Sequence, residues 1–67
     1  MVKIQLNGED REIAGGTSVR ALLDSLGFKP EITVVERNAS IVDRGAFGDT
    51  VLADGDRIEL VRFVGGG

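Results

Sequence analysis

One short stretch of the chain carries the pattern of an amphipathic helix, and extended segments lie on both sides of it. The helix is expected over residues 19–26, where four apolar side chains recur at the spacing of one helical face: Val19, Leu22, Leu23 and Leu26. Gly27 follows, where a left-handed residue can close a helix. A single short helix can cover only one face of one sheet, so the chain is expected to fold in two layers.

The segments before the helix have the pattern of a β-hairpin. Apolar and polar residues alternate over residues 2–6, which is the period of a half-buried strand. Asn7-Gly8 follows, and both residue types tolerate the positive φ angles of a type I′ turn. Residues 9–13 are therefore expected to return as the second strand.

The segments after the helix are mostly extended. β-branched residues dominate residues 32–37, shorter extended pieces are expected at 41–42 and 50–52, and the last strand is expected from Arg57 to about Val64. This order predicts an α+β fold of the β-grasp type. We expect a mixed sheet of four to five strands with the one main helix packed across it, and the last strand in the centre beside the first.

The last strand changes its apolar phase along its length. Ile58 and Leu60 share one phase, whereas Val61 and Phe63 share the other. A strand with one buried face and one solvent-exposed face keeps its apolar residues in a single phase. A β-bulge would explain the change, and so would a second apolar surface that is open to a partner.

Composition limits the chemistry that the chain can perform. It has no cysteine and no histidine, which excludes disulfides, a zinc-thiolate site, a cysteine nucleophile and the commonest general base. Charges of both signs are spread along the sequence, with a net charge of −3, and this argues against nucleic-acid binding. Since no apolar run reaches the roughly 20 residues of a membrane span, no membrane segment is predicted, and a cytoplasmic location is expected.

Two loop motifs carry part of the pattern of a binding site. Asp54-Gly55-Asp56 offers carboxylate oxygens but lacks the further ligands of a calcium loop, so a solvated turn is predicted. The segment 15–18 precedes the helix but lacks the lysine of a phosphate-binding loop, so a helix-entry turn is predicted. No metal and no cofactor of the chain's own is therefore expected.

Three glycines, Gly65-Gly66-Gly67, follow the last strand directly. Glycine adds nothing to a core, and three extended residues span at most about 10 Å, enough to enter a narrow cleft of another protein. A terminal carboxylate is ionised at neutral pH and is a poor electrophile, so it needs activation by an ATP-using partner. The sequence predicts a domain over residues 1–64 and a flexible tail over 65–67. A disordered end or a cloning remnant are the alternative explanations.

Four segments together resemble the ThiS-type sulfur carriers of thiamine biosynthesis, in the ubiquitin-like ThiS/MoaD superfamily. Residues 2–8 resemble the opening of that family, residues 17–23 its helix start and residues 35–38 its central strand. Residues 54–67, which end in Phe63-Val64-Gly65-Gly66-Gly67, closely resemble its C-terminal signature. The resemblance spans the whole chain, and the final segment is its most specific part.

The resemblance implies a ubiquitin-like β-grasp fold and chemistry at Gly67. A ThiF-type adenylyltransferase would convert the carboxyl group of Gly67 to an acyl-adenylate, and a sulfur donor, ultimately a cysteine desulfurase, would convert that to a thiocarboxylate. A ThiG-type thiazole synthase would then take up the sulfur. Gly65 and Gly66 would thread into the partners, which Phe63 and Val64 would contact. The chain would be a co-substrate rather than an enzyme, and a monomer when free.

Two loops depart from the family pattern, and three other functions remain open. Asn38-Ala39 stands where a glycine often completes the turn, and Asp43 stands where a proline is common. The nearest alternative is a MoaD-type carrier for molybdopterin, although the ending of this chain favours the thiamine type. The others are a ubiquitin-like modifier conjugated to lysines through Gly67, and a plain binding module with an incidental tail.

Overall fold

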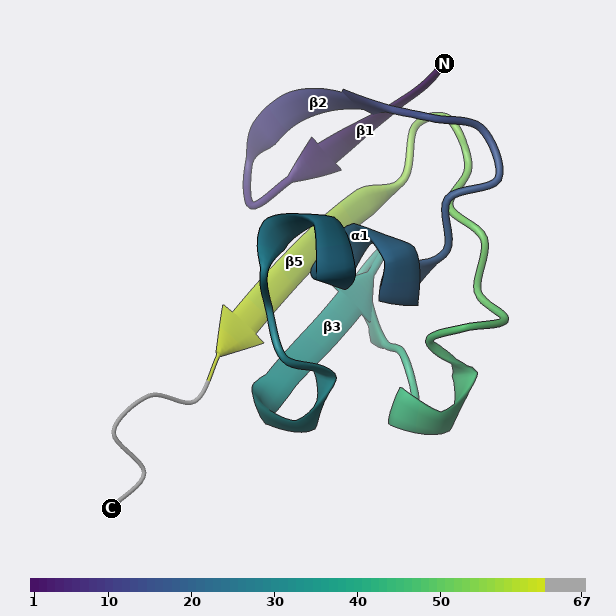
Figure 1. Ribbon diagram of the computed structural model, residues 1–67. Coiled ribbons are helices and arrows are strands. Elements are labelled where there is room, and N and C mark those ends of the chain that lie inside the picture. The colour runs from purple at the N-terminus through teal and green to yellow at the C-terminus, as the bar shows by residue number, and fades with distance from the viewer. Residues whose placement is uncertain (63–67) are drawn as a thin grey trace.

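The computed structural model describes residues 1–62, which form a five-stranded mixed sheet with a helix across one face (Figure 1). The strands are β1 (Val2–Leu6), β2 (Glu9–Ile13), β3 (Thr33–Arg37), β4 (Ser40–Ile41) and β5 (Arg57–Arg62). The helices are α1 (Val19–Leu26) and the short 3₁₀ turns η1 (Pro30–Ile32) and η2 (Arg44–Ala46). The spatial order is β2-β1-β5-β3-β4, so the last strand lies in the centre beside the first, as predicted. Only the β1–β5 pair is parallel among these described strands.

The Asn7-Gly8 turn joins β1 to β2, and Asn7 also forms hydrogen bonds with β5. Asn7 and Gly8 have φ angles of 49° and 85°, which confirms the predicted positive-φ hairpin turn. The backbone N–H of Asn7 donates to the carbonyl oxygen of Ile58 at 2.9 Å. Its side-chain Oδ1 accepts from the N–H of Leu60 at 2.8 Å. One turn residue therefore continues the β1–β5 pairing beyond the end of β1.

The helix α1 begins and ends where the sequence predicts. Ser18 caps it, because its Oγ accepts from the N–H of Ala21 at 3.0 Å, and Gly27 closes it with a φ angle of 75°. The helix packs its apolar face on the sheet, and Phe47 covers the same core. The core contains ten buried apolar side chains: Ile4, Leu6, Val19, Leu22, Leu23, Val35, Phe47, Leu52, Ile58 and Leu60.

The start of the third strand differs from the prediction. Residues Pro30–Ile32 form a 3₁₀ turn, and β3 begins only at Thr33. Pro30 favours this turn because its fixed φ suits the first helical position. The Thr33 hydroxyl donates to the carbonyl oxygen of Lys29 at 2.7 Å and stabilises the turn from its far end. Ile32 is consequently 39% exposed, although its residue type is typical of a buried strand.

The turn between β3 and β4 holds an alanine in a left-handed conformation. Ala39 has a φ angle of 71°, which crowds its Cβ against the backbone. We expect Ala39→Gly to raise the free energy of unfolding by about 0.5–1 kcal/mol, measured by urea denaturation. The control is Ala14→Gly at an exposed alanine that is not among the positive-φ residues, where lower stability is expected. Equal destabilisation by both changes would contradict this account.

Candidate functional site

The residues predicted to carry the function continue from β5. Phe63, Val64, Gly65, Gly66 and Gly67 all lie outside the described residues 1–62, so their predicted roles stay predictions. The strand that leads to them is described, and it is held on both sides. β1 pairs with Arg57 and Ile58, and β3 pairs with residues 58–62.

β5 presents apolar side chains on both of its faces. Ile58 and Leu60 are buried beneath α1, whereas Val61 is 53% exposed on the opposite face. The β3–β5 register runs without interruption from Arg37↔Ile58 to Thr33↔Arg62, so residues 58–62 contain no bulge. The change of phase at Val61 therefore reflects a second apolar surface, one of the two explanations that the sequence left open.

This second surface lies on the face of the sheet opposite α1. Val61 is the cross-strand partner of Val34, which is half-buried. Ile41 lies on the same face, since it pairs with Glu36 as Val61 pairs with Val34, and it is 72% exposed. Two glutamates, Glu36 and Glu59, face each other in the same register. The open face thus combines apolar and acidic side chains immediately before the predicted tail.

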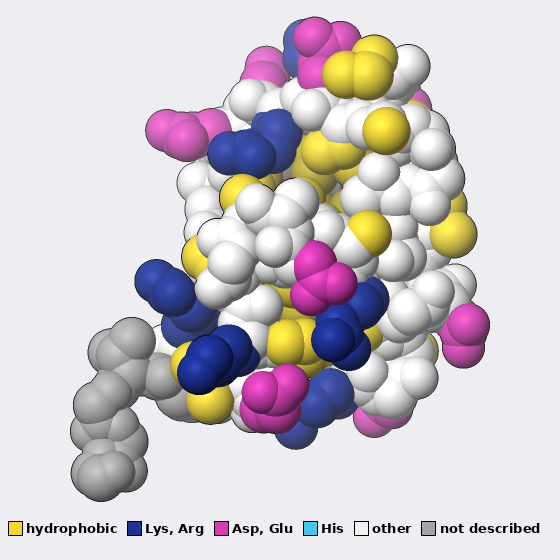
Figure 2. All heavy atoms as spheres, viewed as in Figure 1, with side chains coloured by type: hydrophobic (Ala, Val, Ile, Leu, Met, Phe, Trp, Pro, Cys, Tyr) yellow, Lys and Arg dark blue, Asp and Glu magenta, His cyan; other side chains and the backbone are white. Residues whose placement is uncertain are grey.

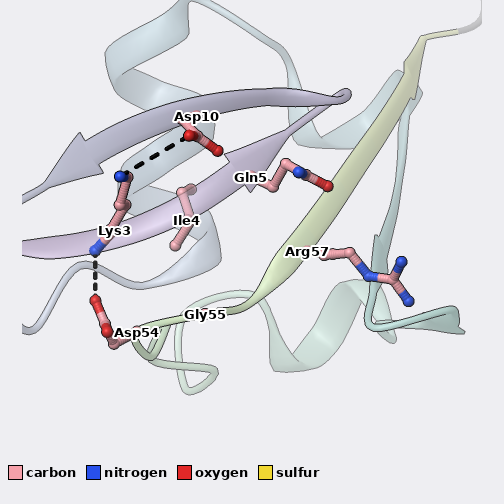
Figure 3. Close-up of a pocket in the computed structure, with 7 residues that line it drawn as sticks. All are labelled: Lys3, Ile4, Gln5, Asp10, Asp54, Gly55 and Arg57. Atoms are coloured by element: carbon pink, nitrogen blue, oxygen red, sulfur yellow. Dashed lines mark hydrogen bonds and ion pairs between the residues drawn. The ribbon is translucent and has the colours of Figure 1, made fainter.

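At the other end of the same face, a hollow of about 420 Å³ lies over the β1–β5 seam (Figure 3). It is lined by seven residues: Lys3, Ile4, Gln5, Asp10, Asp54, Gly55 and Arg57. The Lys3 ammonium lies 3.9 Å from Asp10, and the Lys3 backbone N–H donates to Asp54 Oδ1 at 2.8 Å. The two Lys3 contacts therefore join β1 to β2 and to the turn before β5, which is a structural role.

The Asp54-Gly55-Asp56 segment is a turn, as predicted, and it fastens β5 to its neighbours. Gly55 has a φ angle of 87°, and its N–H donates to the carbonyl oxygen of Lys3 at 2.8 Å. Within residues 1–62, no group of three or more acidic side chains is placed to hold a metal ion. The same part of the chain has no helix long and apolar enough to cross a membrane.

Asp56 is the one carboxylate of the described residues that is buried, with 6% of its surface exposed. Its Oδ2 accepts from the Arg37 Nε and from the Ala53 N–H, both at 2.8 Å. Its Oδ1 accepts from the Asn38 side-chain amide at 3.1 Å. Burial raises the pKa of Asp56, but these hydrogen bonds and the Arg37 charge together hold the pKa below its ordinary value of 3.8. A charged, fully bonded Asp56 joins β5 to the end of β3.

Sequence reasoning missed the side-chain links at the two ends of β5. It placed Asp56 in a solvated turn, because its partners Arg37 and Asn38 are 19 and 18 residues away. It also missed the stacking of Arg62 on Phe28, where the guanidinium carbon lies 4.2 Å from the ring centroid. Neither link has a signal at short sequence spacing.

The side chains described above, within residues 1–62, mainly link β5 to its neighbours. The chain contains neither histidine nor cysteine, and the buried Asp56 is occupied by three donors. Basic and acidic side chains are interspersed on the face shown in Figure 2. What the arrangement can do is hold a central strand in place and present the residues that follow it.

Comparisons with known proteins agree on one family. Residues 4–67 match the ThiS family. A thiazole synthase of Magnetococcus marinus is 50% identical over 66 residues, which are 98% of this chain and 20% of that protein, so the chain spans about a fifth of this relative. The sulfur carrier protein ThiS of Bacillus subtilis is 40% identical, with 96% of this chain and 98% of that protein covered. The crystal structure of the thiamine biosynthesis protein ThiS from Geobacter metallireducens superposes with a TM-score of 0.80 at 33% identity, covering 98% of this chain and all of that one.

Proposed function

The chain belongs to the ThiS family, and from that premise we propose that it is a sulfur carrier for thiazole formation in thiamine biosynthesis. The observation that carries the proposal is the similarity to the Bacillus subtilis sulfur carrier, which extends over 98% of that protein. The β-grasp sheet, with its final strand in the centre, agrees with the Geobacter metallireducens structure.

The sulfur is proposed to reside on the carboxyl carbon of Gly67. A carboxylate does not react with a sulfur nucleophile, so its oxygen first attacks the α-phosphorus of ATP and releases pyrophosphate. The terminal sulfur of a persulfide on the donor then attacks the acyl carbon and displaces AMP, which gives an acyl disulfide. A thiol cleaves this disulfide, so the carrier keeps the sulfur as a thiocarboxylate and the donor sulfur leaves in a disulfide with that thiol. The chain has no histidine or cysteine to catalyse these steps. It is thus proposed to be a co-substrate of a ThiF-type adenylyltransferase and of a sulfur donor fed by a cysteine desulfurase.

The proposed acceptor of the sulfur is a ThiG-type thiazole synthase. This is supported by the relative named thiazole synthase, in which a region similar to this chain makes up 20% of the protein. Phe63 and Val64 are proposed to contact the partners, and Gly65 and Gly66 to lie in their narrow clefts. We propose that the reaction takes place in the cytoplasm and that the free carrier is a monomer.

The test is a mass measurement on the intact chain. Incubation with ATP, a ThiF-type adenylyltransferase and a sulfur donor is expected to replace one oxygen by sulfur, and fragmentation should place the exchange at Gly67. Omission of ATP is the control and should leave the mass unchanged. An unchanged mass in the complete reaction would argue against the proposal. Conjugates of higher mass would instead indicate a protein modifier, and dithiolene formation with a molybdopterin synthase would indicate a MoaD-type carrier.

A further inference from the structure

The last residue of β5 lies beyond the end of β1. β1 ends at Leu6, and the hydrogen bond from Leu60 N–H to Asn7 Oδ1 is the last one on that side of β5 within residues 1–62. Backbone groups alternate in direction along a strand, so the N–H and C=O of Arg62 point to the same side as those of Leu60. At Arg62 that side no longer has a strand to pair with.

The other side of β5 does not fix Arg62 through its backbone either. Arg62 is opposite Thr33 in the β3–β5 register. Because the backbone of Arg62 points away from β3, this is a non-hydrogen-bonded pair, in which the side chains lie close together. The position of Arg62 therefore depends on its side chain more than on ladder hydrogen bonds.

The Arg62 side chain packs on the ring of Phe28. Its guanidinium carbon lies 4.2 Å from the centroid of the Phe28 ring, a cation–π distance. Phe28 is half-buried against the core, and its N–H donates to the carbonyl oxygen of Leu23 at 2.9 Å. The aliphatic part of Arg62 continues the α1-facing row of Ile58 and Leu60, as the long stem of an arginine can.

We propose that Arg62 is a positioning residue for the carrier chemistry and acts through its stacking on Phe28. The stack holds the last residue of β5 in place. We propose that this restricts the orientations in which the chain can leave β5 and approach a partner. A smaller set of orientations lowers the ordering cost of docking. This inference rests on the proposed function, and it predicts that loss of the stack weakens carrier recognition without slowing the chemical step.

The kinetic test uses the full chain as the substrate of a ThiF-type adenylyltransferase. Arg62→Met and Phe28→Leu are each expected to raise the KM for the carrier two- to fivefold, which corresponds to a cation–π contact of about 0.5–1 kcal/mol, with kcat unchanged. The double variant should be no worse than either single variant. Arg62→Lys, which keeps the cation, should retain part of the effect. Arg11→Met, at the edge strand β2, removes a charge elsewhere and should leave KM unchanged.

A second readout does not depend on the partner. In NMR spectra, the Arg62 side-chain protons should show an upfield ring-current shift that disappears in Phe28→Leu. An increase in KM with Arg62→Met but not with Phe28→Leu would overturn the proposal, since Arg62 would then act without the ring. If the wild-type chain is adenylated normally but its Arg62 protons show no ring-current shift, the Arg62–Phe28 stack is absent in solution and the positioning role is wrong, while the proposed function stands. A normal shift in a chain that is never adenylated would overturn the proposed function and, with it, the carrier role of Arg62.

Discussion

Deletion of Gly67 is expected to abolish sulfur transfer and to leave the fold unchanged. The new terminal carboxyl group would fall one residue short, and one extended residue spans about 3.3–3.6 Å. Because a misplacement of about 1 Å can cost on the order of 10²-fold in rate, we expect thiocarboxylate formation to fall by at least that factor. The buried core lies between Ile4 and Leu60, so the free energy of unfolding should change by less than about 0.5 kcal/mol.

The matched control for this deletion is Gly67→Ala. It keeps the carboxyl group at the same distance along the chain and adds only a methyl group, so it should retain more transfer than the deletion does. Intact-mass measurement gives the extent of sulfur transfer, and urea denaturation gives the stability of each variant. Sulfur transfer by the shortened chain at the wild-type rate would rule out the carboxyl carbon of Gly67 as the carrier atom. A collapse in stability would show that Gly67 belongs to the fold.

Replacement of Asp56 by alanine is expected to destabilise the fold strongly. It removes the acceptor of three donors, from Arg37, Asn38 and Ala53, and leaves their groups without that partner at a buried position. We expect a loss of about 2–4 kcal/mol, below the full cost of breaking a buried pair, because the Arg37 side chain is 32% exposed. Native proteins have roughly 5–15 kcal/mol of stability, and a 67-residue domain lies toward the low end, so this loss should produce a detectable unfolded fraction at 37 °C.

The matched control is Asp54→Ala in the same turn. Asp54 is exposed and accepts one hydrogen bond, from the backbone of Lys3, so a loss of about 1 kcal/mol or less is expected. Urea denaturation of the two variants and the wild type measures both effects. Equal losses at the two positions would contradict the role assigned to the buried carboxylate.

The Asp56 contribution should also depend on pH. Its pKa is lowered on folding, so the stability it supplies is fully present above the unfolded value of 3.8. That stability is lost as the pH falls from there through the lower pKa of the folded state. The stability difference between wild type and Asp56→Ala should therefore be constant near neutral pH and should shrink below about pH 4. A difference that grows on acidification would contradict the lowered pKa.

The parts of the fold that the sequence predicts are those encoded at short range. The hairpin at Asn7-Gly8 and the limits of α1 depend on φ preferences and on caps within a few residues, and both are confirmed. The element order was enough to place β5 in the centre of the sheet. Ile32 was assigned to the strand because a β-branched residue suits one, and the outcome depends on the local hydrogen bonds of the 3₁₀ turn Pro30–Ile32.

The side-chain links that support the site could not be predicted in the same way. Asn7 Oδ1 meets the N–H of Leu60 across 53 positions of sequence, and only the β1–β5 register brings them together. The stacking of Arg62 on Phe28 likewise depends on where β5 ends relative to the loop after α1. The chemistry assigned to Gly67 came from the family resemblance and not from any local pattern, and it stays a prediction.

The central position of β5 has a consequence for the order of events during synthesis. β5 is the last described strand to leave the ribosome, yet it joins β1 to β3, which share no direct pairing in the sheet order. A nascent chain that lacks β5 has two separate hairpins and no continuous sheet, so we expect it to stay unfolded until residues 57–62 emerge. Fragments truncated before β5 would then be open to proteases, and they would not compete with complete carriers for the partner enzymes.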